Sequence, residues 1–167
     1  MNAACGIEVA ALRFLNAFAP RPDPNCQYSG VIPKLLSQTL DGEALVVYAD
    51  GTQSRDFTYV ENVVAAARAA REFPLDGPLI CNVGCGSAHT VLALAEAVGR
   101  VAERAVQIEH VPARPGDVLH SYADITLARE ALAYDPTVGL EEGLERTLGW
   151  MLAQRRAGSP AAWSVKQ

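Results

Sequence analysis

The feature of this sequence that most constrains its fold is a repeated alternation of short apolar runs with longer amphipathic segments. The short runs are rich in β-branched residues and bounded by Gly, Pro, Asn or Asp, which is typical of strands. The longer segments repeat apolar residues at helical spacing. This alternation predicts an α/β fold with parallel crossover units. We expect strands at 7–14, 44–48, 54–60, 78–83 and 106–111, and helices at 29–40, 60–73, 90–103, 124–133 and 140–156.

Two strand predictions go further. The run Ile7–Phe14 is apolar at nearly every position, which indicates a strand buried on both faces. The segments Ala44–Tyr48 and Ser54–Val60 flank an Asp-Gly turn, which predicts a hairpin-like pair. The residues from Gly158 onward are expected to form a flexible tail.

Helix boundaries are indicated by capping and breaking residues. Ser29, Thr90 and Asp124 each precede an apolar periodic segment, so they are predicted N-caps. Pro33 is tolerated in a first helical turn. Pro74 is expected to end the helix before it, because proline cannot continue a helix.

Composition excludes several classes of protein. The chain has 167 residues, half of them hydrophobic, and a net charge of −5, whereas a nucleic-acid binder carries a basic patch. A phosphate ligand would therefore be met by a few placed arginines. No run approaches the ~20 apolar residues of a membrane span, so a soluble cytoplasmic protein is expected. The four cysteines have no CxxC spacing, and free thiols without a metal site are expected.

Arg55 and Asp56 lie where an extended segment leads into a helix. The guanidinium could bind a phosphate in bidentate fashion, and Asp56 could orient it or accept hydrogen bonds from backbone amides. The alternative is a surface ion pair at the end of a hairpin.

Three further polar residues follow predicted strands. Arg114 and Asp117 lie on a loop bounded by proline and glycine, and ligands of α/β proteins bind beyond the carboxyl ends of strands. They suit a second phosphate contact and a sugar hydroxyl, or else the loop is only a rigid turn. Asn16 follows the first strand, where it could contact a phosphate or sugar oxygen or close an Asx turn.

Catalytic motifs are missing from the sequence. The segment Gly84–His89 lies between a strand and a helix but has His89 where a dinucleotide fingerprint needs its third glycine, so we interpret it as a tight turn. No tyrosine has a lysine four residues later, so the acid–base pair of short-chain oxidoreductases is absent. The three histidines fall on separate loops and indicate neither a metal site nor a catalytic triad.

Taken in order, LRFLNAFAPRPDP, YSGVIPKLL, ADGTQSRDFTYVENVV, NVGCGSAHTVLALAEAVG and ARPGDVLHSYADITLAREAL resemble the C-terminal half of extended short-chain dehydrogenase/reductases. The similarity is to NAD-dependent nucleotide-sugar epimerases and dehydratases, especially the UDP-glucose and UDP-N-acetylglucosamine 4-epimerases, and runs from about Gly6 to Leu152. It implies a Rossmann-type fold of which this chain supplies the small substrate-binding lobe with late strands and helices of the parallel sheet. Residues 1–157 would form this portion, with 158–167 as the tail.

The resemblance also implies roles for individual residues. Arg55 and Arg114 would clamp the substrate diphosphate, Asp117 would bind a ribose hydroxyl, and Asn16 would contact the diphosphate or hexose. Tyr48 would lie against the uracil ring. The backbone of a short loop would meet the nucleobase through Gly30, Val31 and Ile32.

Three positions depart from the family pattern. Ala19 and Ala49 replace glycines, so a positive φ at either position would strain the backbone. Pro22 replaces a glutamine and stiffens its loop. None of these departures affects the two arginines or Asp117.

The chemistry that the resemblance implies is transient oxidation of the sugar at C4 by NAD, with a tyrosine as base and hydride return to the opposite face. The glycine fingerprint and the Tyr-Lys pair would precede Met1, so we assign no catalytic residue to this chain. Strands at 8–14 and 79–83 would then lack neighbours, which predicts self-association as a homo-oligomer, or a fragment that pairs with a complementing N-terminal half. The alternatives are a non-catalytic nucleotide-sugar-binding or regulatory protein, an inactive truncated product, and a dehydratase or decarboxylase of the same superfamily.

Overall fold

Strands and helices alternate along the chain in the computed structural model, which describes residues 9–21, 30–72, 74 and 77–158. The helices are α2 (Val31–Asp41), α3 (Val60–Glu72), α4 (Val91–Val101), α5 (Thr126–Leu132) and α6 (Leu140–Arg156). The strands are β1 (Ala10–Phe14), β2 (Ala17–Phe18), β3 (Leu45–Tyr48), β4 (Ser54–Arg55), β5 (Thr58–Tyr59), β6 (Leu79–Val83), β7 (His89–Thr90), β8 (Ile108–Val111) and β9 (His120–Ser121). The predicted α/β class is confirmed.

Strand pairing is mostly parallel and joins segments far apart in sequence. β1 pairs with β6, β2 with β5 and β3 with β8, all in parallel. β4 lies between β7, which is antiparallel to it, and β9, which is parallel. The predicted hairpin of 44–48 with 54–60 is therefore wrong. β3 hydrogen-bonds to β8 instead, and the amide of Ser54 donates to the carbonyl of Leu119 (2.8 Å).

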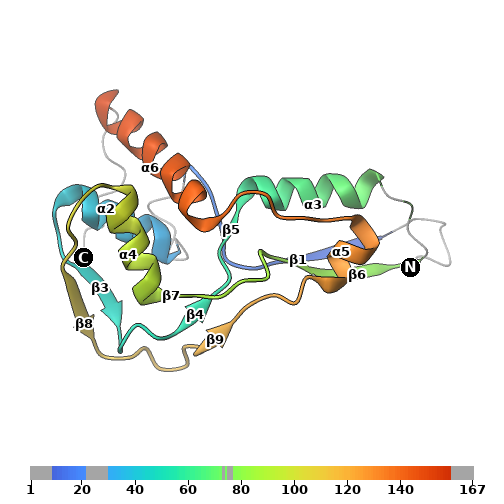
Figure 1. Cartoon of the computed structure of the whole chain (residues 1–167), viewed down its shortest axis with the longest axis horizontal. Helices are drawn as coiled ribbons and strands as arrows, with labels where there is room; N and C mark the ends of the chain where they lie inside the picture. Colours follow the sequence, from blue (N-terminus) through green and yellow to red (C-terminus); the bar gives the residue numbers. More distant parts are fainter. Residues whose placement is uncertain (1–8, 22–29, 73, 75–76, 159–167) are drawn as a thin grey trace.

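Two hydrophobic cores lie in two lobes at opposite ends of an elongated molecule (Figure 1). In the first lobe α2, α4 and α6 pack with β3, and Leu36, Leu94 and Leu144 are fully buried. In the second lobe α3 and α5 pack on the β1–β6 pair, where Val83 and Leu132 are fully buried. The short strands β4, β5, β7 and β9 lie between the lobes (Figure 1).

The β1–β6 pair is covered on one face only. The side chains that alternate toward α3 and α5 are buried, including Cys81 and Val83, whereas Ile80 is 53% exposed. Phe14 is 49% exposed, and the burial pattern of β1 contains no fully buried residue. Burial of this strand on both faces is therefore wrong for the described residues, because no element among them packs on the second face. The exposed apolar surface expected of these two strands is present.

Capping by a side chain explains where α4 begins, whereas α5 differs from the prediction. The hydroxyl of Thr90 accepts from the amide of Ala93 (3.0 Å), so its predicted role as the N-cap of α4 is confirmed. The carboxylate of Asp124 accepts from the amide of Thr126 (3.0 Å), but the N-cap of α5 is Ile125 and the helix starts one residue later than Asp124 would require. The predicted tail beyond Gly158 lies outside the described residues.

Candidate functional site

A cavity of about 660 Å³ opens beyond the carboxyl ends of β1, β3 and β8. This is the position at which α/β proteins bind ligands, and its volume falls within the range of small-molecule sites. All eight residues singled out from the sequence line this one cavity: Asn16, Gly30, Val31, Ile32, Tyr48, Arg55, Arg114 and Asp117. Tertiary structure thus brings together four segments that are widely separated along the chain.

Arg55 is held firmly at the wall of the cavity. Its Nη1 donates to the carbonyls of Ser54 (2.8 Å) and Leu119 (3.4 Å), and its Nη2 donates to a carboxylate oxygen of Asp117 (2.6 Å). Its side chain is only 17% exposed. A guanidinium has five N–H groups, so two remain available to a ligand, on Nε and Nη2. The alternative, a surface ion pair at the end of a hairpin, is wrong, because Arg55 pairs with Asp117 in the cavity wall and β3 and β4 form no hairpin.

Arg114 lies over the ring of Tyr48. Its Cζ is 4.1 Å from the ring centroid, and its Nη2 donates to the phenolic oxygen (2.8 Å). This hydrogen bond lowers the pKa of the Tyr48 phenol, and the charge of the guanidinium acts in the same direction. Arg114 therefore covers part of the ring surface that was expected to meet a nucleobase, so a base would stack on the remaining surface or on the guanidinium itself.

Two cations of the cavity were missed in the sequence. Lys34, in the first turn of α2, lies with its Nζ 5.9 Å from the Tyr48 ring centroid, and Arg21 lines the same cavity. Both fall inside the segments that carry the resemblance, which was the only available signal. Together with Arg55 and Arg114 they make four cationic side chains against the carboxylate of Asp117. The cavity is therefore positively charged in an acidic chain.

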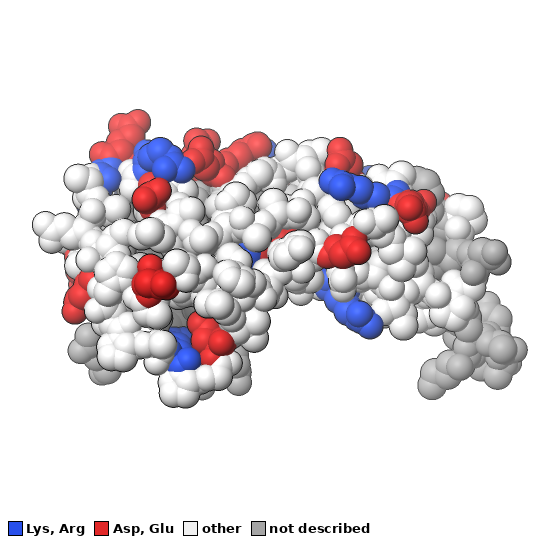
Figure 2. Space-filling view, turned by 60° about the horizontal axis from the view of Figure 1, so that its bottom comes forward, with Lys and Arg blue, Asp and Glu red and all other residues white. Residues whose placement is uncertain are grey.

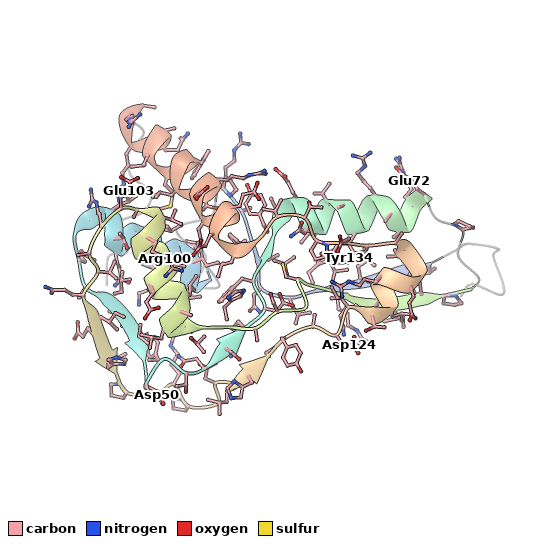
Figure 3. The ribbon with its side chains drawn as sticks, viewed as in Figure 1. Asp50, Glu72, Arg100, Glu103, Asp124 and Tyr134 are labelled. Atoms are coloured by element: carbon pink, nitrogen blue, oxygen red, sulfur yellow. The ribbon has the colours of Figure 1, made fainter. Side chains whose placement is uncertain are left out.

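The cavity cations are not part of a broad basic surface. On the face shown in Figure 2, basic and acidic side chains are interspersed over a largely uncharged surface. Figure 3 labels Arg100 on α4, which pairs with Glu141 of α6 away from the cavity. Positive charge concentrated at a cavity suits a small anionic ligand better than a nucleic acid.

The amino end of α2 faces the cavity without a side-chain cap. Its N-cap is Gly30, and Ser29, the predicted cap, lies outside the described residues. The first-turn amides of a helix have no intrahelical acceptor. Val31 and Ile32 line the cavity and their amides have no intrahelical acceptor, and the contact of this segment with a nucleobase stays a prediction.

Asp56 is fully buried and binds backbone amides. Its carboxylate accepts from Cys85 (2.9 and 3.1 Å), Gly86 (2.9 Å) and Ala123 (3.3 Å). The expectation that it accepts from backbone amides is confirmed. A Cβ at Gly84 would lie 2.5 Å from this carboxylate, which explains the glycine. The turn at 84–86 therefore binds Asp56 with the amides that a dinucleotide loop would offer to phosphate.

Asn16 bonds across the fold and not within its own turn. Its Nδ2 donates to the backbone carbonyl of Asp56 (2.9 Å), and no amide of the following described residues donates to its Oδ1, so the Asx-turn alternative is wrong. Its φ of 36° is positive, which asparagine tolerates better than most residues. Ala49 also has a positive φ, 52°, so the strain predicted for this replaced glycine is present, whereas the φ of Ala19 is not positive.

The cysteines and histidines are the remaining candidates. Within the described residues, no group of three or more His, Cys, Asp and Glu side chains is placed to hold a metal ion. Cys81 and Cys85 are free thiols, and burial raises the pKa of both, while Cys5 and Cys26 lie outside the described residues. No described helix has both the length and the apolar character needed to cross a membrane.

An α/β protein with a cationic cavity at the carboxyl ends of its strands is the class that these features define. Residues 1–84, just over half of the chain, match the model of the NAD dependent epimerase/dehydratase family. The chain belongs to this family.

Individual relatives agree with that assignment. The chain is 31% identical over 151 residues to a UDP-N-acetyl-alpha-D-glucosaminuronate decarboxylase of Bacillus cytotoxicus, spanning 87% of this chain and 46% of that protein. A UDP-N-acetylglucosamine 4-epimerase from Methanobrevibacter ruminantium, solved with UDP-N-acetylmuramic acid, matches with a TM-score of 0.84 and 37% identity over 92% of this chain and 49% of that one. A UDP-glucose 4-epimerase of Thermus thermophilus, solved with NAD, matches with a TM-score of 0.74 and 32% identity over 89% and 48%. The chain thus spans about half the length of these relatives.

Proposed function

We propose that this chain binds a nucleotide diphosphate sugar, with a UDP-sugar as the favoured ligand, as the substrate half of an NAD-dependent nucleotide-sugar 4-epimerase. The observation that carries the proposal is the placement of Arg55 and Arg114, with two further cationic side chains and one carboxylate, at a single cavity that is open to solvent. The solved epimerase relative contains a UDP-sugar. Two arginines can neutralise a diphosphate, and the cavity is large enough for a small ligand.

In this assignment each part of the ligand has its own contacts. The diphosphate lies between Arg55 and Arg114, and Asn16 reaches a diphosphate or hexose oxygen with the amide proton not used by Asp56. Asp117 accepts from a ribose hydroxyl, since a carboxylate accepts but cannot donate. The base meets the amino end of α2 and the aromatic surface near Tyr48.

The described residues do not fit the dinucleotide itself. The turn at Gly84 is a strand-to-helix glycine turn of the described residues, and the amides of Cys85 and Gly86 within it are already bonded to Asp56. NAD, which would supply reversible removal of hydride, is therefore assigned to a complementing half. This chain contributes substrate binding and orientation, and no catalytic acid or base is assigned to it.

The complementing half has a surface on which to dock. Parallel sheets in α/β proteins are covered on both faces, but Ile80 is 53% exposed on the face of the β1–β6 pair that lies opposite α3 and α5. The relatives are about twice as long as this chain. We propose that an NAD-binding half covers this face, with self-association of the chain as the competing outcome.

Calorimetry tests the proposal directly. Titration of the chain with UDP, UDP-glucose and UDP-N-acetylglucosamine should release heat with a 1:1 stoichiometry, and inorganic sulfate at equal ionic strength should not compete well. Absence of binding at millimolar UDP-sugar would overturn the binding role. If binding occurs but no epimerised product forms after adding NAD and an NAD-binding half of the family, the non-catalytic sensor is favoured. Release of CO2 from a UDP-uronic acid would favour the decarboxylase alternative, which the Bacillus relative supports.

A further inference from the structure

We propose that Asp56 is a positioning residue of the nucleotide-sugar site, because its buried carboxylate and backbone hold Asn16, Arg55 and the Asp117 loop in the geometry that binds diphosphate. This inference rests on the proposed function. Asp56 does not line the cavity itself, and it is 0% exposed.

The first contact runs through the backbone of Asp56. Its carbonyl accepts from Nδ2 of Asn16 (2.9 Å), and this bond fixes the amide side chain at the cavity wall. Its own amide donates to the carbonyl of Ser121 (3.0 Å), which sets the register of β9 against β4. Asp56 therefore holds Asn16 through its carbonyl. Through its amide it also fixes the backbone next to Arg55.

The second contact runs through the carboxylate. It accepts from the amide of Ala123, two residues beyond the β9 register bond, and from the turn at Cys85 and Gly86. Figure 3 labels Tyr134, whose hydroxyl donates to the carbonyl of Gly84 (2.9 Å) and holds this turn from the other side. Two chain segments, the turn at 85–86 and the residue at 123, are thereby tied to one buried carboxylate.

A short stretch of chain connects these hydrogen bonds to the residues that would contact the ligand. From Ala123 the chain runs back through β9 to Leu119, whose carbonyl accepts from Arg55. Two residues earlier is Asp117, which pairs with the same guanidinium (2.6 Å). Loosening the segment at 121–123 therefore frees the loop that aligns Arg55. A buried carboxylate with several amide donors is also hard to replace, since asparagine would present N–H groups to donors.

The test is a double-mutant cycle that compares UDP with uridine. Asp56→Asn should weaken UDP binding by about 10-fold or more, whereas uridine, which lacks the diphosphate and keeps only the ribose contact to Asp117, should be weakened by a clearly smaller factor. In an Arg55→Ala background the same substitution should have little further effect on UDP, because contacting residues are non-additive when one acts through the other. Thr147→Val is the control: Thr147 is fully buried in α6, outside the cavity, and should leave both ligands unaffected.

The outcomes separate this inference from the proposed function. If the wild-type chain does not bind UDP, the proposed function fails. If wild type binds but Asp56→Asn matches it, weakens UDP and uridine equally, or adds fully to Arg55→Ala, only the positioning role fails. Should Asp56→Asn not fold, Gly86→Ala is the milder variant, since its positive φ of 67° strains an alanine and displaces one amide from the carboxylate. It should give the same selective loss of UDP, and equal loss of both ligands would again refute the role.

Discussion

Replacing Arg55 by alanine is the most direct test of the cavity as a diphosphate site. The guanidinium is rigid because three of its hydrogen bonds go to protein acceptors, and it is mostly buried. A ligand phosphate would therefore pay little side-chain entropy when it binds the two remaining N–H groups. Hydrogen bonds to charged groups contribute about 1.5–3 kcal/mol, which corresponds to about 10- to 150-fold weaker UDP binding in Arg55→Ala.

The loss has a second component that the structure identifies. Without Arg55, the carboxylate of Asp117 is left unpaired beside the bound diphosphate, and like charges repel. Asp117→Asn in the Arg55→Ala background should therefore recover part of the lost affinity, although alone it removes a partner and weakens binding. Recovery should be larger at low ionic strength, because salt screens the repulsion.

Isothermal titration with UDP at two salt concentrations measures both components. Arg100→Ala is the matched control, because Arg100 also forms an ion pair but lies on α4 away from the cavity. The reasoning is refuted if Arg55→Ala changes the UDP dissociation constant by less than about 3-fold, or if Arg100→Ala weakens binding as much.

Three further outcomes are expected. Arg114→Ala should raise the pKa of the Tyr48 phenol, because the hydrogen bond and the charge of Arg114 lower this pKa. Absorbance titration, with Tyr48→Phe as the reference, measures the change. An unchanged pKa would contradict the contact. Ala49→Gly should stabilise the chain by about 0.5–1 kcal/mol in urea unfolding, because relief of left-handed strain exceeds the entropy cost, whereas Ala19→Gly should not stabilise it. Ile80→Glu should leave the isolated chain within about 0.5 kcal/mol of wild type but abolish its pairing with an NAD-binding half or with itself, as sedimentation would detect.

Local patterns predicted much of the fold because they depend on nearby residues alone. Helical periodicity predicted α3 and α6 nearly to their ends, and Thr90 was identified as a cap because capping is a contact with the next turn. Strand pairing was not predictable in this way. The segments 44–48 and 54–60 resembled a hairpin, yet β3 pairs with β8, some 60 residues away in sequence, because the two strands share the hydrophobic core of the first lobe.

For the candidate site, too, the sequence predicted the residues but not the contacts between them. The sequence by itself determined the residue types, and through the family motifs it indicated all eight positions that line the cavity. Only the tertiary structure decided their relations: Arg55 pairs with Asp117, Arg114 lies on Tyr48, and Lys34 joins them. These are contacts between segments distant in sequence, and no local pattern encodes which side chain reaches which. The charge on Asp56 was visible from the start, but its burial and its three amide partners followed from the fold alone.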